Sequence, residues 1–424
     1  MKGIFKDLPV LRSLKDTFAP LLTRTSPVTR RWVPRLGAVA VCAMLGACSG
    51  GLNGLVGGGE GGPTLGASNV PGTVIGQGAV KVALLLPLSA SGQGGQAAQS
   101  LRNAAELAYS EFNNPDLQIL VKDTRGTAEG ARAAAQAVVA EGAELIIGPL
   151  FAAEVQAVAQ VAKPAGKPVI AFSTDANVAS RGVYLLSFMP QTEISRIVAF
   201  AAQQRRRSFA AFVPETAYGT VAEAAFRTAA ASARVQVGLV ERFPTDNARM
   251  REAAQKVAAI ASGANPQVDT IFLPDGGSSL ASAAQALQTA GVNGSRVKLV
   301  GTGIWNDPQV LALPTMQGGW FAAPDSAGFA AFARRYSARY NAEPVRIASL
   351  SYDAVSLAAA LVRTQGSQRF SEQVLTNPSG FAGADGVFRF LPDGTNQRAL
   401  AVLEIRNGAA VTVSPAPREL KPDS

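Results

Sequence analysis

A unit of strand, loop and helix at residues 80–112 constrains the fold more than any other part of the sequence. It begins with an apolar run, Val80–Pro87, which is too short for an average helix and ends at proline, as is typical of a buried parallel strand. A loop of small residues continues to Gly95, and apolar residues then recur at helical spacing up to Phe112. In an open parallel sheet such loops lie at the carboxyl ends of the strands, where doubly wound folds bind ligands.

The same unit repeats along much of the chain and predicts two α/β lobes. In the first lobe we expect further strands at residues 117–121, 144–149, 168–175 and 184–188. A helix at 193–204 opens a second series, with strands at 208–213, 235–240, 270–274 and 297–301. Helices at 329–340 and 347–362 have no strand between them and are expected to return to the first lobe. The carboxyl end predicts a β-hairpin of residues 387–390 and 401–405 around the turn at 392–394.

Length and charge exclude some classes of protein. A chain of 424 residues with 47% hydrophobic content can bury the cores of two domains. Its net charge of +9 is concentrated in residues 1–47, where eight basic residues against two acidic ones supply +6 of it. The remainder is close to neutral, so no nucleic-acid partner is expected. The one basic run in the body, Arg205–Arg207, is either a solvated helix end or a phosphate or partner site.

Histidine is absent, and the cysteines are Cys42 and Cys48. Nucleophilic systems that use an imidazole base are therefore excluded, as are the usual zinc sites. A carboxylate-only enzyme remains conceivable, but nothing in the sequence shows which carboxylates meet in space. The sequence predicts a non-catalytic protein with no cofactor and no metal.

The amino terminus combines a basic segment with an apolar stretch, residues 36–47, of the length of a signal-peptide core. The stretch ends in Leu45-Gly46-Ala47-Cys48, which resembles the bacterial lipoprotein signal; the alternative is a short buried helix with an incidental cysteine. The resemblance implies that residues 1–47 are removed and that Cys48 carries the lipid, palmitate included. It implies a periplasmic protein anchored in a membrane, and Ser49 favours the outer membrane. Residues 48–78 are rich in glycine and predict a tether with a reach of roughly 30 Å.

From residue 80 to about residue 413 the sequence resembles the type I periplasmic binding proteins, in the branch of the leucine-binding receptors. The carriers are, in order, residues 82–89, 121–124, 146–149, 168–173, 217–219, 351–355 and 390–394. The resemblance implies an α/β fold of two lobes with parallel sheets flanked by helices and three hinge crossings, closing around a solute. It assigns residues 79–191 and 322–373 to lobe 1, residues 192–321 and 374–415 to lobe 2, and 416–424 to a tail.

Carried over by position, the resemblance implies nine ligand-binding candidates: Ser89, Ser91, Ala152, Ser173, Thr174, Asp175, Tyr218, Asp275 and Trp305. Each hydroxyl has an alternative as a turn or cap residue, Asp275 as a helix cap, and the two aromatic residues as buried side chains beneath the hinge. Where amino-acid receptors carry ligand-binding hydroxyls and an acidic residue, this chain has Phe151-Ala152-Ala153 and Gly301-Thr302-Gly303. An ordinary α-amino acid would therefore lose partners for both of its charges.

These departures favour the branch of penicillin-binding-protein activators, lipoproteins that share the two lobes and contact a peptidoglycan synthase. The alternative is a substrate-binding lipoprotein that serves the permease of an ABC importer for branched-chain amino acids or a related small polar solute. Either function leaves room for a small polar ligand in the cleft and places the protein at a membrane through its lipid anchor.

Overall fold

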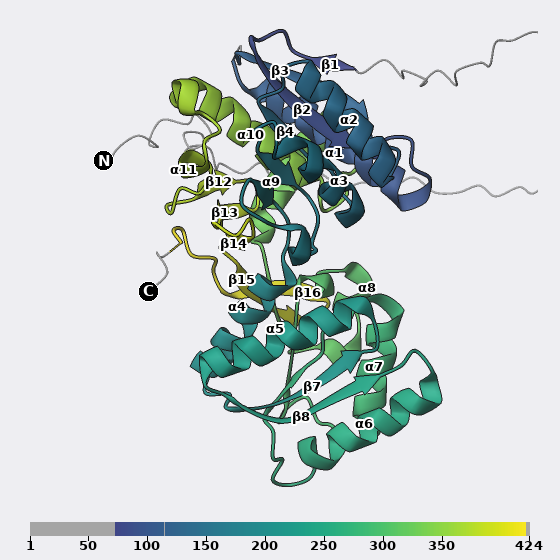
Figure 1. Ribbon diagram of the computed structural model, residues 1–424. Coiled ribbons are helices and arrows are strands. Elements are labelled where there is room, and N and C mark those ends of the chain that lie inside the picture. The colour runs from purple at the N-terminus through teal and green to yellow at the C-terminus, as the bar shows by residue number, and fades with distance from the viewer. Residues whose placement is uncertain (1–72, 114, 421–424) are drawn as a thin grey trace, which may run out of the picture. The chain divides into compact units, whose positions relative to one another are not determined.

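The computed structural model describes residues 73–113 and 115–420. They form two α/β lobes, each built on an open sheet with helices on both faces (Figure 1). The predictions for the signal peptide and Cys48, and for most of the tether, lie outside the described residues. Within the described part, no helix has the length and apolar character needed to cross a membrane.

The first lobe holds a six-stranded sheet in which all neighbours are parallel except the edge pair β1–β3. Its order is β1 (Val74–Ile75), β3 (Leu117–Asp123), β2 (Val80–Leu86), β4 (Leu145–Ile147), β5 (Val169–Ala171) and β6 (Val183–Leu185). One face carries α2 (Ala128–Ala140) and α3 (Ala152–Ala162), and the other α1 (Gly92–Glu111) and α10 (Ala348–Thr364). Helix α9 (Ser326–Tyr340) also packs against α1, so the two late helices return to this lobe, as the sequence predicts.

The second lobe holds a seven-stranded sheet whose neighbours are parallel except for the two pairs made by the strand of residues 401–406, which are antiparallel. Its order is β16 (Ala409–Ser414), β15 (Ala401–Arg406), β11 (Trp320–Ala323), β10 (Lys298–Gly301), β9 (Thr270–Phe272), β7 (Ser208–Pro214) and β8 (Gln236–Phe243). Helices α4 (Pro190–Gln203) and α5 (Ala217–Ala233) cover one face. Helices α6 (Asn247–Ala261) and α7 (Gly277–Thr289), with the short α8 (Pro308–Leu311), cover the other.

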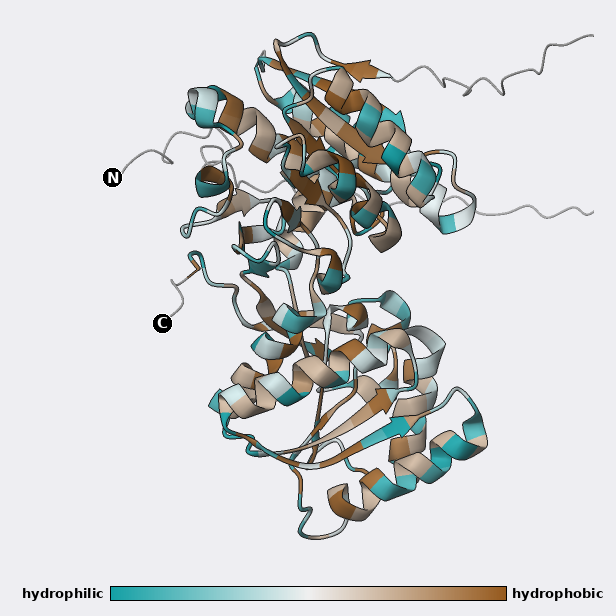
Figure 2. Cartoon of the chain, in the orientation of Figure 1, coloured by the Kyte–Doolittle hydropathy of each residue, from teal (hydrophilic) through white to brown (hydrophobic). Residues whose placement is uncertain are grey.

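Apolar runs and helix caps explain why these elements form where the sequence predicts them. Strand β2 is buried along almost its whole length between two layers of helices, which accounts for its continuous apolar run (Figure 2). Helix α2 begins after Thr127, whose side chain accepts a hydrogen bond from the backbone N–H of Gly130. Beyond the end of α4, Arg206 donates to the backbone carbonyls of Asp269 and Arg296. The basic run is thus a helix end held onto neighbouring loops.

The predicted carboxyl-terminal hairpin is wrong in its second strand. Strand β13 (Gly386–Phe390) does turn back at residues 392–394, but it pairs with the short β14 (Asn396–Arg398). Strand β15 lies in the other lobe, between β11 and β16. The polar sequence of β14 does not indicate a buried strand. Asn396 and Arg398 can be buried because they donate hydrogen bonds to the backbone carbonyls of Leu185 and Ser187.

The lobe boundaries also differ from the predicted ones, because residues 381–398 form a small sheet in the first lobe. Strand β12 (Phe381–Gly383) joins β13 and β14 in a small sheet, and Phe381, Phe388 and Phe390 pack in the core of the first lobe. Residues 374–398 therefore belong to the first lobe rather than the second, and β11 belongs to the second. Residues 73–78 are not tether: β1 pairs with β3, and the N–H of Gly78 donates to the carbonyl of Leu117.

The chain crosses between the lobes three times, after β6, after β11 and after β14. Helix α4 follows the first crossing, α9 the second, and β15 the third.

Candidate ligand-binding site

A cavity of about 740 Å³ lies where a loop of the first lobe faces two helices of the second. The first lobe contributes residues 174–177, which follow β5 and include the first two residues of the short 3-10 helix η2 (Ala176–Val178). Helix α4 contributes Pro190, Gln191 and Ser195. The rest of the lining is one face of α5: Ala217, Tyr218, Val221, Ala224, Ala225, Thr228, Ala229 and Ser232. A loop after a strand and a helix N-terminus thus meet at the cavity, as expected at the carboxyl ends of parallel strands.

Hydrogen bonds between residues close in sequence fix the first-lobe wall. The hydroxyl of Ser173, which is buried, accepts from the N–H of Asp175 at 3.1 Å. Asp175 in turn caps η2, because its Oδ1 accepts from the backbone and side-chain nitrogens of Asn177 at 3.0 and 2.9 Å. Thr174 is exposed and lines the cavity beside Asp175. The wall therefore presents one hydroxyl and one carboxylate, and Ser173 supports them from behind.

The second-lobe wall centres on Tyr218, in the first turn of α5. Its phenol oxygen lies 2.8 Å from Oγ1 of Thr302, in the loop after β10. Burial, with the nearby charge of Glu193, raises the pKa of Tyr218, so the phenol stays neutral. The ring therefore offers an apolar face and a hydroxyl already engaged in a hydrogen bond.

Glu193, in the first turn of α4, is buried directly behind this wall. Its Oε2 accepts from the N–H of Gly303 at 2.9 Å, and a Cβ on Gly303 would lie 2.8 Å from Oε1. Burial raises the pKa of Glu193 to about 7, while the Gly303 N–H and the cation of Arg346 oppose the rise. Glu193 and Tyr218 thus hold two consecutive loop residues, Thr302 and Gly303.

Asp275 lies before α7, and its Oδ1 accepts from the N–H of Gly276 at 2.9 Å. Its Oδ2 is buried without a well-formed hydrogen bond, and burial raises the pKa of the carboxyl although the Gly276 N–H and the nearby Ser279 lower it. Asp275 does not line the cavity, but it is close enough to raise the pKa of Tyr218 further.

The structure brings three of the nine predicted ligand-binding residues to the cavity: Thr174, Asp175 and Tyr218. Ser173 and Asp275 lie behind its walls. Ser89 and Ser91 lie on another loop of the first lobe, Ala152 is the first residue of α3, and none of the three lines the cavity. The N–H of Ser89 donates to Asp123 at 3.2 Å, and Ser91 precedes α1 without a capping side-chain hydrogen bond.

Trp305 differs most from the expectation that it covers a ligand. It is fully buried in the second-lobe core, where its Nε1 donates to the carbonyl of Leu273 at 3.2 Å and its ring packs near Phe321. A Cβ on Gly301 would lie 2.1 Å from the indole. The glycine therefore makes room for the ring, which belongs to the core and not to the cleft.

Sequence reasoning missed the cavity-facing stripe of α5, together with Gln191 and Glu193. The stripe has ordinary helical spacing, so its pattern alone does not distinguish a cavity wall from a core. The available signal was that α5 has two apolar stripes: its other side buries Ala222, Phe226 and Ala230 against the sheet.

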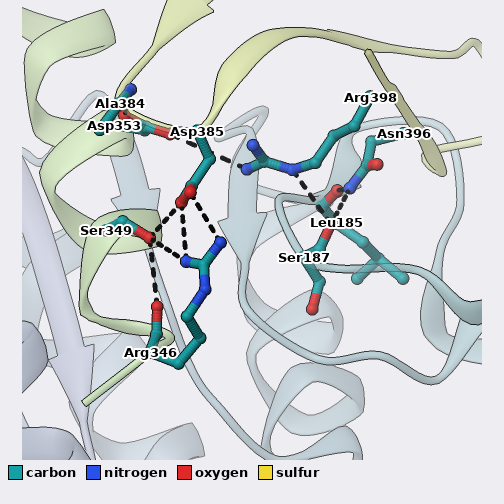
Figure 3. A network of polar contacts seen from close by, with 9 residues as sticks. All are labelled: Leu185, Ser187, Arg346, Ser349, Asp353, Ala384, Asp385, Asn396 and Arg398. Atoms are coloured by element: carbon teal, nitrogen blue, oxygen red, sulfur yellow. Dashed lines mark hydrogen bonds and ion pairs between the residues drawn. The ribbon is translucent and has the colours of Figure 1, made fainter. Parts of the chain in front are cut away.

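A network of charged and polar side chains joins the first and third crossings (Figure 3). Arg346 donates to both carboxylate oxygens of Asp385 at 3.0 and 2.7 Å. Ser349 donates to the same carboxylate (Figure 3). Arg398 is 4% exposed and reaches the carbonyl of Ser187 through Nε at 3.4 Å.

The second carboxylate of the network is Asp353. Its Oδ1 accepts from the N–H of Ala384 at 2.6 Å, and its Oδ2 lies 3.9 Å from Nη2 of Arg398 (Figure 3). Burial raises the pKa of Asp353 to about 7 although the Arg398 cation opposes the rise, and burial lowers the pKa of Arg398. The two charges offset each other without a close hydrogen bond between them.

With two lobes, three crossings and a cavity framed by both lobes, the structure has the architecture of a two-lobed binding protein. A family model described as "Periplasmic binding protein" matches residues 79–410. The chain therefore belongs to the periplasmic binding protein family, and membership implies a periplasmic location. No curated protein sequence matches the chain significantly.

Solved structures of type I periplasmic binding proteins share the fold. A protein from Rhodospirillum rubrum assigned to branched-chain amino acid ABC transport is 22% identical, with a TM-score of 0.70 over 79% of this chain and 99% of that chain. The branched-chain amino acid transporter substrate-binding protein LivJ from Streptococcus pneumoniae, solved with isoleucine, is 19% identical, with a TM-score of 0.55 over 79% and 99%. A solute-binding protein from Rhodopseudomonas palustris, solved with 3,4-dihydroxybenzoic acid, is 16% identical, with a TM-score of 0.57 over 81% and 98%.

At these identities the structures establish the fold and not the ligand. Solute-binding proteins are a non-catalytic class. The sequence favours the function of a penicillin-binding-protein activator, but the comparisons support the alternative function, solute binding for ABC transport, better.

Proposed function

We propose that the protein captures a small polar solute between its lobes and presents it to the permease of an ABC importer. The observation that carries the proposal is the cavity of about 740 Å³ framed by residues 174–177 of one lobe and by α4 and α5 of the other. A ligand that touches both walls stabilises the arrangement in which they face each other, so binding and lobe closure are linked. Thr174, Asp175 and Tyr218 are the proposed contacts.

The charges of the lining narrow the choice of solute. Asp175 is the one charged residue among those that line the cavity. An ammonium group of a ligand can therefore pair with Asp175, whereas a carboxylate of a ligand finds no basic residue in the lining. A branched-chain amino acid would therefore bind through its ammonium and its side chain, with its carboxylate held by hydroxyls or solvent.

Calorimetric titration of the purified protein with leucine and isoleucine tests this proposal, and benzoate, which has a carboxylate but no ammonium group for Asp175, is the control that should not bind. We expect binding that weakens at least tenfold in a Tyr218→Ala variant and is unchanged in Ala231→Ser, an exposed position of α5 outside the cavity. If no small solute binds at millimolar concentration, or if both variants bind equally well, the proposal fails.

The anchoring of the protein is a second part of the proposal. We infer that Cys48 is acylated and that the outer membrane holds the protein, from the Leu45–Cys48 motif and from Ser49. Mass spectrometry of the membrane fraction tests this: we expect a lipid-modified amino-terminal Cys48 that disappears, together with membrane association, in a Cys48→Ser variant. An unmodified Cys48 in the mature protein would contradict it.

Activation of a peptidoglycan synthase is the second candidate function. The observation that favours it is the lack of any basic residue in the lining, together with Ala152 at a position where amino-acid receptors carry hydroxyls. The two functions separate in one assay, the rate of glycan polymerisation by a purified synthase with and without the protein. A several-fold rise with the protein would support activation, and an unchanged rate would leave solute capture as the function.

A further inference from the structure

The cavity is longer than a site for one amino acid requires. Its lining on α5 runs from Ala217 to Ser232, which at 1.5 Å per residue is a length of about 22 Å. Its volume of about 740 Å³ lies in the range of pockets that take drug-sized ligands, on the order of 300–1,000 Å³. The side chains along this length are mostly small, and several are exposed, Ala224 and Ser232 among them. An extended ligand can therefore lie against the helix.

Several oxygens along the groove are free to accept hydrogen bonds from a ligand. Thr228 and Ser232 each donate their hydroxyl hydrogen to the carbonyl one turn earlier, at 3.1 and 3.0 Å, which leaves their oxygens to accept. Oε1 of Gln191 is buried in the α4 side of the lining and has no hydrogen-bond partner. A buried acceptor without a partner is costly unless a ligand supplies a donor. Asp175 adds a carboxylate.

We propose that the cavity binds a short peptide in an extended conformation, with its amino terminus at Asp175 and its backbone along α5. This inference rests on the proposed function as a solute-binding protein and names the class of solute. At about 3.3 Å per residue, a groove of about 22 Å holds roughly six residues. Backbone N–H groups of alternate residues, which share one edge of an extended chain, supply donors to Gln191, Thr228 and Ser232, and the other edge faces the open side of the groove.

Other ligand classes match the lining less well. A single amino acid would leave most of α5 and the Gln191 acceptor uncovered. A linear polyamine would bring several ammonium groups to a lining that holds one carboxylate. An anionic solute would find no basic residue in the lining. A peptide with small side chains matches the length of the groove, its amino group matches the one carboxylate of the lining, and its N–H groups match the free acceptors.

Two variants probe the length and charge of the site. Ala224→Phe places a ring in the middle of the groove at an exposed position, and Ala259→Phe, at an exposed position of α6 outside the cavity, is its matched control. Asp175→Asn removes the charge but keeps a residue that caps η2 well. The full-length protein in detergent is titrated calorimetrically with leucine, dialanine, pentaalanine, N-acetyl-pentaalanine and spermidine.

We expect pentaalanine to bind at least tenfold more tightly than dialanine. Ala224→Phe should weaken the binding of pentaalanine at least tenfold, and Ala259→Phe should leave it unchanged. N-acetylation of the peptide and Asp175→Asn should each weaken binding about tenfold, and the two changes together should weaken it no further, because both remove the same ion pair. Binding of leucine without pentaalanine overturns the peptide inference and leaves solute capture standing. Binding of spermidine without pentaalanine, or equal binding of dialanine and pentaalanine, also overturns it. Binding of none of the five overturns both proposals.

Discussion

Replacing Arg398 with methionine should destabilise the protein strongly at alkaline pH and only weakly at acidic pH. The direct contacts of the guanidinium are long, 3.4 Å to the carbonyl of Ser187 and 3.9 Å to Asp353, so their own loss costs little. The larger cost is that ionised Asp353 stays buried without its nearest cation. Removing one partner of a buried ion pair typically costs about 3–5 kcal/mol. We therefore expect Arg398→Met to lower the free energy of unfolding by about 3–5 kcal/mol at pH 8.5.

The pH dependence of this cost follows from the titration of Asp353. In the wild type its folded pKa of about 7 lies above the unfolded value of 3.8, so stability is highest when the carboxyl is protonated and is lost as the pH rises through 7. Without Arg398 the folded pKa rises further, and the loss continues above pH 7. At pH 5.5 both folded proteins hold a neutral Asp353. There we expect only the loss of packing against Phe188 and Phe388, about 1 kcal/mol.

Urea unfolding followed by circular dichroism at pH 5.5 and pH 8.5 measures both values. The same substitution in an Asp353→Asn background is the control, because no ionisable carboxyl remains at this position, and its cost should not depend on pH. A cost of Arg398→Met that is equal at the two pH values would refute the reasoning, since it would mean that the ionised Asp353 does not depend on Arg398.

Three further predictions concern the second lobe. Tyr218→Phe removes the bond to Thr302 and should weaken binding of any cavity ligand severalfold while costing about 1 kcal/mol of stability, measured by calorimetry and urea unfolding. Glu193→Gln keeps an acceptor for the N–H of Gly303. Because the pKa of Glu193 is raised from 4.5 to about 7, the free energy of unfolding of the wild type should fall by about 3 kcal/mol between pH 4.5 and 7.5, and that of the variant should not. An equally steep fall in the variant would contradict this assignment. Trp305→Phe should cost about 1–3 kcal/mol yet leave ligand affinity unchanged, and a large loss of affinity would return the indole to the cleft.

The order of strands and helices was predictable because each buried strand carries its own apolar run and each helix its own stripe. The path of the carboxyl-terminal segment was not. Strand β14 is polar, and its burial depends on carbonyl groups of Leu185 and Ser187 that lie about two hundred positions earlier in the chain. No local pattern in a sequence encodes a partner at that distance.

The candidate site was predictable in its loops and not in its helix face. Thr174, Asp175 and Tyr218 follow strands, and strand ends are where this architecture places ligand contacts. Trp305 also follows a strand, yet Gly301 leaves space beneath its ring, so the side chain turns into the core. Whether an aromatic residue at a strand end faces a cleft or a core depends on that local space, which becomes visible only once both residues are placed.

The wall of the cavity and the first crossing between the lobes are coupled through two consecutive residues. Thr302 contacts Tyr218 in the cavity wall, and Gly303 donates to Glu193 in the first turn of α4, the helix that follows that crossing. The loop cannot move far from α4 without breaking the 2.9 Å hydrogen bond between Gly303 and Glu193. Under the proposed function, a ligand that engages Tyr218 would act on the helix that follows the first crossing, and this contact would couple solute binding to lobe closure.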